Sequence, residues 1–227
     1  MTDLLPNLHW IEGRASNVYL WIGETGLALF DTGTPGDVDR ILDYIKKIGR
    51  NPAELSTILI THADLDHAGG AAAIQARTGA VVYAGKETAA YMKQGKSPPH
   101  MPRWIQFLMD RFFKYHPVPE TATRYITEGQ PLADLDDWQV LASPGHTMDH
   151  HAFFNRREGI LMAGDALNTR KDRLNCTPER ISADMDAART SARRLLRLTP
   201  AVIACGHGSP FLEHDAGDIM MLDRALA

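Results

Sequence analysis

Residues 59–70, LITHADLDHAGG, place two histidines and two aspartates within six positions, between an apolar run and a pair of glycines. The apolar residues at the start are typical of a short buried strand, and the small residues at the end predict a helix over 68–79. Asp64 or Asp66 could cap that helix, because an aspartate there accepts hydrogen bonds from backbone N–H groups. Imidazole and carboxylate groups are also ordinary metal ligands. One strand-to-helix loop could therefore supply both a cap and a metal site.

The composition indicates one globular domain. The chain has 227 residues, of which 44% are hydrophobic and 23% are charged, and it has no long polar tract that would indicate disorder. We therefore expect a single domain over residues 1–227. The net charge of −4 gives no general attraction to nucleic acid or to an anionic membrane, so neither is an expected partner.

The N-terminal residues MTDLLPNLHWIEG carry acids and a proline where a secretory signal has basic residues and a long apolar stretch. No later segment is long enough to span a bilayer, and we expect a cytoplasmic protein. The two cysteines, Cys176 and Cys205, do not form a close metal-binding pair, and a chain of this length needs no disulfide. We interpret both as structural thiols.

Hydrophobic periodicity predicts alternating strands and helices. Residues 17–31 predict a hairpin around the turn GETG, and 38–49 predict a helix with one apolar face. Strands are predicted at 56–60 and 80–85, on either side of the 68–79 helix. In the second half, strands are predicted at 138–145, 150–155, 159–165 and 200–208, with a helix at 184–198. This order implies an α/β sandwich with largely internal sheets.

The stretch 97–120 interrupts this order, because it has prolines near both ends and is rich in aromatic residues. A short amphipathic helix is predicted there, with one face formed by Trp104, Phe107, Leu108, Arg111, Phe112 and Tyr115. As an apolar flap it would cover a bound substrate and exclude water, so Trp104, Phe107 and Phe112 are expected to contact substrate. A dimer interface or ordinary packing would explain the same pattern, which leaves a homodimer open. His100 and His116 are candidates for substrate contact, but we favour the interpretation that both are solvated loop histidines.

Metal-ligand residues follow several predicted strands. LITHADLDH contains His62, Asp64, Asp66 and His67, while His146, Asp165 and His207 end VLASPGH, ILMAGD and AVIACGH. Loops after strands can meet at one edge of a sheet, where α/β folds commonly place their sites. Seven donors exceed the three or four that one catalytic zinc takes from protein. The pattern therefore predicts two metal ions, which can hold a hydroxide and polarise the group that it attacks, as in hydrolysis.

These residues resemble a known family. The run His62-x-Asp64-x-Asp66-His67, followed by His146, Asp165 and His207, is similar to the H-x-H-x-D-H signature and the later ligands of the metallo-β-lactamase-fold hydrolases. The resemblance extends from FDTG at 30–33 to GHG at 206–208. It implies an αββα sandwich with the site at one edge of the paired sheets, and it leaves 97–120 as an insertion.

The resemblance also implies a role for each matching residue. His62 and His146 would bind the first metal, Asp66, His67 and His207 the second, and Asp165 would lie between the two. Asp66 would orient the attacking water. Asp31 would accept a hydrogen bond from a ligand histidine, and a turn aspartate is the alternative; His150 would support the site without binding metal.

Asp64 departs from the family pattern, which has a histidine at this position. An aspartate is shorter, so it reaches the first metal only if the loop moves inward or a water bridges the gap. As a ligand it would add a negative charge and a hard oxygen donor. We therefore expect two divalent ions, with zinc as the first choice and manganese or iron favoured by Asp64.

The fold family hosts several reactions, so the fold alone does not choose among them. We expect a hydrolase that uses a metal-bound hydroxide on a small-molecule ester, lactone or related acyl compound. A glutathione thioesterase ranks lower, because the sequence ends 20 residues after His207, where such an enzyme usually carries a helical extension with basic residues. A phosphodiesterase also ranks lower, because the net charge of −4 offers little support for a basic groove that binds phosphates. Iron-dependent sulfur oxidation and a partly degenerate, metal-binding protein without turnover are the alternatives from other classes.

Overall fold

The computed structural model describes residues 2–171, 173–212 and 216–226. The chain divides into two compact units, which we call unit 1 and unit 2. Unit 1 comprises Met1–Pro98 and Phe107–Ile126, and unit 2 comprises Pro99–Gln106 and Thr127–Ala227. The chain thus passes between the units three times, twice inside the predicted insertion and once just after it.

Unit 1 is built on a seven-stranded sheet in which the strands follow one another in chain order. Its strands are β1 (Thr2–Leu5), β2 (Leu8–Glu12), β3 (Asn17–Ile22), β4 (Leu27–Phe30), β5 (Leu55–Leu59), β6 (Val81–Ala84) and β7 (Thr123–Tyr125). The pairs from β1 to β4 are antiparallel, and those from β4 to β7 are parallel. Parallel pairing requires crossovers, and these are supplied by the helices.

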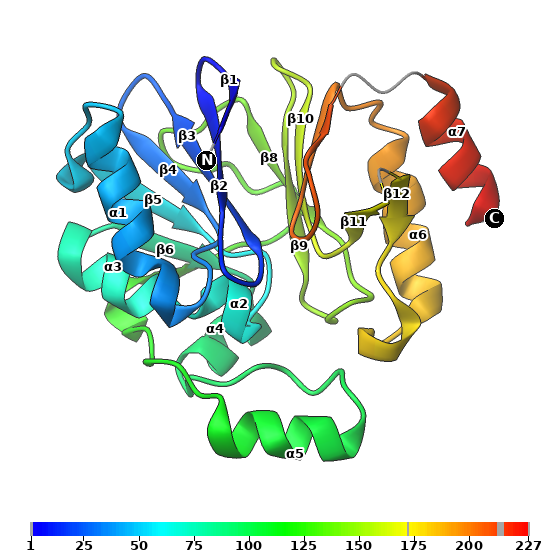
Figure 1. The fold of residues 1–227 in the computed structure, drawn as a ribbon, viewed down its shortest axis with the longest axis horizontal. Helices are drawn as coiled ribbons and strands as arrows, with labels where there is room; N and C mark the ends of the chain where they lie inside the picture. The colour runs from blue at the N-terminus through cyan, green and yellow to red at the C-terminus, as the bar shows by residue number, and fades with distance from the viewer. Residues whose placement is uncertain (1, 172, 213–215, 227) are drawn as a thin grey trace. The chain divides into compact units, whose positions relative to one another are not determined.

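The helices of this part of the chain are α1 (Val38–Lys47), α2 (Leu65–Ala68), α3 (Ala71–Thr78), α4 (Lys86–Met92) and α5 (Arg103–Phe112). Figure 1 shows α1 and α3 beside strands β4–β6. The apolar face predicted for 38–49 is buried there, with Ile41 and Ile45 fully covered. Burying this apolar face is what holds the helix on the sheet.

Unit 2 contains a five-stranded sheet with the order β14-β13-β10-β9-β8. Its elements are β8 (Trp138–Ala142), β9 (His151–Asn155), β10 (Ile160–Gly164), β11 (Leu167–Arg170), β12 (Arg173–Cys176), α6 (Met185–Leu196), β13 (Val202–Cys205), β14 (Phe211–Leu212) and α7 (Ala216–Ala225). Strands β11 and β12 form a separate hairpin. Leu195 and Leu196 of α6 pack with Ile203 and Cys205 of β13 in one apolar cluster.

Strand direction decides where the loops go. β4 and β5 are parallel, so the loops after Phe30 and Leu59 leave the same edge of the first sheet. In unit 2, β10 and β13 are parallel, and β8 runs in the same direction because β9 is antiparallel to both of its neighbours. The loops after β8, β10 and β13 therefore leave one edge of the second sheet.

Every strand and helix predicted from periodicity is present, with ends shifted by a few residues. The insertion helix is shorter than its apolar spacing suggested, because it ends at Phe112 and leaves Tyr115 outside it. The structure adds elements that periodicity did not single out, namely β1, β2, β7, β11, β12, β14, α4 and α7. Among the described residues, no helix combines the length and the apolar composition that crossing a bilayer requires.

We predict that Ile58→Ala lowers the free energy of unfolding by about 2–5 kcal/mol, since it removes a fully buried β5 side chain from the core of unit 1. Ser56→Ala is the matched control, because Ser56 lies on the same strand with its side chain exposed, and a change within about 0.5 kcal/mol is expected for it. Urea denaturation of both variants checks this. Equal midpoints for Ile58→Ala and the parent would contradict it.

Candidate functional site

The ligand loop of unit 1, residues 61–68, brings four of the predicted metal ligands together. His62 follows β5, and Asp66 and His67 lie in the short helix α2. His62 Nε2 is 3.5 Å from Asp64 Oδ2, and His67 Nε2 is 3.9 Å from Asp66 Oδ2. The two imidazole rings lie 4.2 Å apart, centroid to centroid. His62, Asp64 and His67 are buried, whereas Asp66 is partly exposed.

Asp31 organises both histidines from the neighbouring strand end. Its Oδ2 accepts a hydrogen bond from His67 Nδ1 at 2.8 Å, and its carboxylate also accepts from the Thr61 backbone N–H and hydroxyl at 2.9 Å each. Thr61 Oγ1 in turn lies 2.9 Å from His62 Nδ1. We assign the proton to Nδ1 in both rings, because Asp31 only accepts and the Thr61 proton is already donated to it. Nε2 of each ring then carries the lone pair that a metal needs.

The backbone at Asp31 is in the left-handed region, with φ at +57°. Aspartate and asparagine tolerate this conformation better than most residues other than glycine. Asp31 N–H donates to Leu59 O at 2.9 Å, so the turn is held against the end of β5. The conformation thus directs the Asp31 carboxylate across to Thr61 and His67.

Two glycines allow the ligand loop to approach the 31–34 turn. Thr32 donates to His67 O through both its backbone N–H and its hydroxyl, each at 2.7 Å. A Cβ on Gly70 would lie 2.5 Å from Thr32 O, and one on Gly69 would lie 2.7 Å from Pro35 Cδ and 3.2 Å from Gly33 O. Backbone atoms cannot yield to such contacts, so the glycine pair is required for this packing.

Asp64 is the N-cap residue of α2 by position, but its side chain makes no capping hydrogen bond. Its backbone carbonyl accepts from His67 N and Ala68 N at 3.0 and 2.8 Å. Asp66 lies inside the helix and cannot occupy the N-cap position. Neither carboxylate is therefore used for capping, and that of Asp64 faces His62.

Unit 2 brings the remaining three predicted ligands together at the edge where β8, β10 and β13 end. His146 Nε2 is 3.5 Å from Asp165 Oδ2, and His207 Nε2 is 3.2 Å from the same oxygen. Thr177 Oγ1 lies 3.3 Å from His146 Nδ1. A single carboxylate thus faces two imidazoles.

Glycines also position the unit 2 ligands. A Cβ on Gly145, which precedes His146, would lie 2.4 Å from Ala188 N of α6. One on Gly208, which follows His207, would lie 1.9 Å from Thr169 O. His207 O also accepts a backbone hydrogen bond from Thr169 at 3.1 Å. The loops that carry His146 and His207 therefore contact the backbone of Ala188 and Thr169 directly.

His150 contacts the unit 2 ligands through hydrogen bonds. Its Nδ1 is 2.7 Å from Ser143 Oγ, and its Nε2 accepts from the Asp165 backbone N–H at 3.1 Å. Because both ring nitrogens are engaged with protein atoms, His150 fixes the backbone of Asp165 and offers no lone pair to a metal.

The donors fit divalent metal ions. With metal–ligand distances of about 2.1 Å, two ligands of a tetrahedral ion lie about 3.4 Å apart. The four Nε2–carboxylate distances, 3.2 to 3.9 Å, are centred on this spacing. Three of them exceed the usual hydrogen-bond range of about 2.7 to 3.2 Å. Each cluster therefore presents mixed nitrogen and oxygen donors at the separation that zinc, manganese or iron accepts.

The aromatic residues predicted to contact substrate lie on α5 with their side chains exposed. Trp104, Phe107 and Phe112 are exposed to 68, 67 and 65%. His100, expected to be solvated, is instead buried, because its ring packs edge-on against that of His146 with centroids 4.7 Å apart; His116 is exposed as predicted. The sequence did not indicate the roles of Thr61 and Thr177, which contact His62 and His146. For Thr61 the one available signal was its position next to His62 in the chain.

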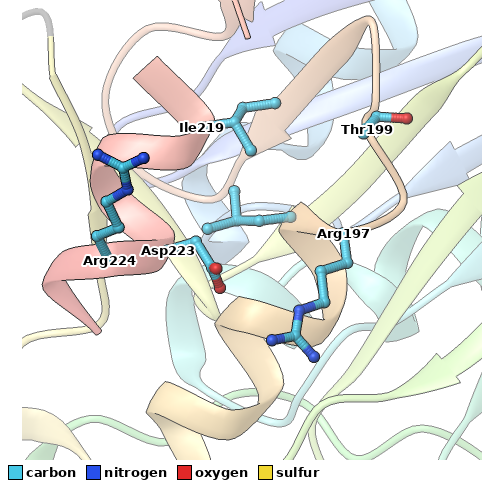
Figure 2. A pocket seen from close by; sticks show the side chains of 6 residues that line it. Arg197, Thr199, Ile219, Asp223 and Arg224 are labelled. Atoms are coloured by element: carbon cyan, nitrogen blue, oxygen red, sulfur yellow. The ribbon is translucent and has the colours of Figure 1, made fainter. Parts of the chain in front are cut away.

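A hollow of about 270 Å³ lies elsewhere in unit 2, between α6 and α7 (Figure 2). It is lined by Leu196, Arg197, Thr199, Ile219, Asp223 and Arg224. The guanidinium groups of Arg197 and Arg224 point away from each other in Figure 2. The hollow contains none of the predicted ligands and offers no pair of converging cations, so we assign it no role.

Neither Cys176 nor Cys205 forms a disulfide, and burial raises the pKa of both thiols. For the fully buried Cys205 the pKa rises to about 12, so on the order of one molecule in ten thousand carries its thiolate at pH 8. We predict that iodoacetamide at pH 8 leaves Cys205 unmodified in the native protein and alkylates it in urea. Mass spectrometry of both samples checks this, and rapid labelling of the native thiol would contradict it.

We predict that Asp31→Asn lowers Zn²⁺ affinity by about 10- to 100-fold, because the substitution removes the charge that orients His67 and His62 while keeping a residue that tolerates φ > 0. Asp134→Asn is the matched control, since Asp134 has φ at +60° but is exposed and is not one of the predicted ligands or their partners. Competition with a chromophoric chelator measures both. Equal affinities for Asp31→Asn and the parent would refute the role.

Comparison with known proteins places this geometry in a family. Residues 11–207 match the model of the metallo-beta-lactamase superfamily. The probable metallo-hydrolase YflN of Bacillus subtilis (strain 168) is 27% identical over 228 residues, covering 92% of this chain and 86% of that protein. A hydroxyacylglutathione hydrolase of Idiomarina loihiensis is 29% identical over 165 residues, covering 70% of this chain and half of that protein.

The fold is similar to that of solved members. A metallo-beta-lactamase family protein from Thermus thermophilus superimposes with a TM-score of 0.75 at 25% identity, covering 99% of this chain and 79% of that one. The fold class predicted from the sequence, an α/β fold of the metallo-β-lactamase type, is confirmed. The chain therefore belongs to the metallo-β-lactamase superfamily and is a metallo-hydrolase.

Proposed function

We propose that the ligand clusters of the two units together bind two divalent metal ions and that the chain hydrolyses a small-molecule ester or lactone. His62, Asp64 and His146 would hold the first ion, Asp66, His67 and His207 the second, and Asp165 would lie between them. Membership of the superfamily supports assigning both clusters to one two-metal site. The observation that carries the proposal is the repeated pairing of an Nε2 atom with a carboxylate at ligand spacing.

Zinc is the first choice of metal, because nitrogen-rich donor sets with carboxylates suit it, and the oxygen donor of Asp64 makes manganese or iron alternatives. When bound, such ions lower the pKa of water and polarise the carbonyl group that is attacked. The chain's own residues supply the rest of the chemistry. Asp66, the most exposed of the unit 1 ligands, would accept a hydrogen bond from the attacking water and so orient it.

The supporting residues hold the ligand rings in one orientation through hydrogen bonds to Nδ1. Asp31 and Thr61 hold the protons on Nδ1 of His67 and His62, and Thr177 contacts Nδ1 of His146. His150 holds the backbone of Asp165. Because these rings cannot rotate without losing a buried hydrogen bond, the donors are oriented before the metal arrives.

A small molecule is the substrate class we infer, since the net charge of −4 gives little attraction to the phosphates of nucleic acid. A thioester is the second candidate, because matched relatives include hydroxyacylglutathione hydrolases. The chain spans half to about two thirds of the length of those two proteins. Three expectations stay predictions. They are that substrate contacts Trp104, Phe107 and Phe112, that the protein forms a homodimer, and that it is cytoplasmic.

The test combines metal analysis with a screen of lactones, aryl esters, thioesters, β-lactams and phosphodiesters. We expect two metal equivalents and turnover of at least one acyl substrate, lost on chelation and restored by Zn²⁺, Mn²⁺ or Fe²⁺. His67→Ala should lower that turnover by at least about 100-fold, because it removes a ligand and the partner of Asp31. His116→Ala is the control, since His116 is exposed and outside both clusters.

Other results would replace the proposal. Full activity in His67→Ala would refute the ligand assignment. A protein that binds no metal would favour the degenerate alternative. An iron-dominated protein that consumes oxygen with a persulfide would indicate sulfur oxidation, and higher kcat/KM for thioesters than for esters would select the second candidate.

A further inference from the structure

Two side chains from the insertion contact the backbone on either side of Asp64. Tyr115 donates its hydroxyl hydrogen bond to Ala63 O at 2.9 Å, and Ser97 Oγ accepts from Leu65 N at 3.2 Å. The preceding carbonyl and the following amide of Asp64 are thus both held by residues distant in sequence. All of these residues belong to unit 1.

Hydrogen bonds also join Tyr115 to the residues just before the insertion, next to the ligand loop. Tyr115 N–H donates to Gly95 O at 3.2 Å, and the Tyr115 hydroxyl lies 3.1 Å from Lys96 O. Gly95 has φ at +64°, and a Cβ there would lie 2.1 Å from Tyr115 O, so only glycine permits this closure. We call Gly95–Ser97 together with Tyr115 the stem of the insertion.

The Tyr115 hydroxyl is a buried, permanent donor. Its side chain is only 5% exposed. Burial, with a smaller contribution from the Asp64 carboxylate, raises the pKa of Tyr115 above its usual value, so the proton stays on the oxygen at any working pH. A buried carbonyl such as Ala63 O would lose its partner if this donor were removed, which costs free energy and lets the loop shift.

The position of the Asp64 backbone matters because its side chain is short. Where the metallo-β-lactamase pattern has a histidine, aspartate reaches less far from the same Cα. A displacement of the loop by about 1 Å would take the carboxylate out of ligand range, since metal–oxygen distances vary by only about 0.2 Å. The backbone position of Asp64 therefore has to be fixed more precisely than it would for a histidine at the same position.

We propose that Ser97 and Tyr115 are positioning residues that fix the backbone of Asp64 where its short side chain can bind the first metal. This inference rests on the proposed function, which assigns Asp64 to that metal. The insertion thereby contributes to metal binding through its stem, independently of what its helix α5 contacts.

The test titrates metal-free protein with Co²⁺ and follows both stoichiometry and the visible absorption of the bound ion. Tyr115→Phe should weaken one of two bound Co²⁺ ions by at least about tenfold and change its spectrum, while the other ion binds as in the parent. Ser97→Ala should act in the same direction and removes only a single hydrogen-bond acceptor, which guards against failure of the tyrosine variant to fold.

Tyr44→Phe is the matched control. Tyr44 is also buried in unit 1, and its hydroxyl bonds His9 Nδ1 and Asp3 at 2.9 and 3.1 Å, away from the ligand loop. It should lose comparable stability in urea and bind both Co²⁺ ions normally. Asp64→Glu provides a rescue, because its extra methylene lets the carboxylate reach further; in that background the Tyr115→Phe effect should fall below about threefold.

The outcomes separate the two levels of inference. Selective weakening of one ion by Tyr115→Phe, absent in Tyr44→Phe and suppressed by Asp64→Glu, supports positioning. Two tightly bound ions in the parent with no selective weakening in Tyr115→Phe and Ser97→Ala overturn the positioning role and leave the proposed function intact. A parent protein that binds fewer than two ions overturns both.

Discussion

The carboxylate of Asp31 is the point on which the organisation of the unit 1 ligands depends. It accepts hydrogen bonds from His67 Nδ1 and from the backbone and hydroxyl of Thr61, which in turn contacts His62. A charged acceptor with three buried donors makes each of these bonds stronger than a neutral equivalent. Removing it would leave the ring orientations undetermined and the donors buried without a partner.

The direction of the strands explains how ligands from distant parts of the sequence meet at one edge of each sheet. β4 and β5 are parallel, so Asp31 and His62 emerge at one edge, and β8, β10 and β13 do the same for His146, Asp165 and His207. Ligands far apart in sequence are gathered by backbone hydrogen bonding, and the glycines beside them allow backbone to touch backbone. The sheets therefore fix the backbone positions of the ligands, and side-chain hydrogen bonds then orient the rings and carboxylates.

The strand-helix order could be predicted because apolar spacing reports burial directly. The ligand candidates could be proposed because histidine and aspartate recur after such strands. The contacts between segments distant in sequence could not be predicted: Thr61 with Asp31, His150 with Asp165, and Tyr115 with Ala63. Strand β11 was not predicted because its sequence, LNTR, is largely polar, and β14 because two residues carry too little periodicity. The prediction for His100 was wrong because its burial depends on a ring far along the chain.

The closed stem has a consequence for how this chain can change over evolutionary time. Because Gly95 and Tyr115 bond to each other and Ser97 and Tyr115 bond to the ligand loop, the residues between them begin and end at a fixed frame. Insertions, deletions and drift within 101–114, a range that leaves out His100 and its contact with His146, can therefore alter the surface that α5 presents without moving Asp64. Substrate preference could diversify there while metal binding is inherited unchanged.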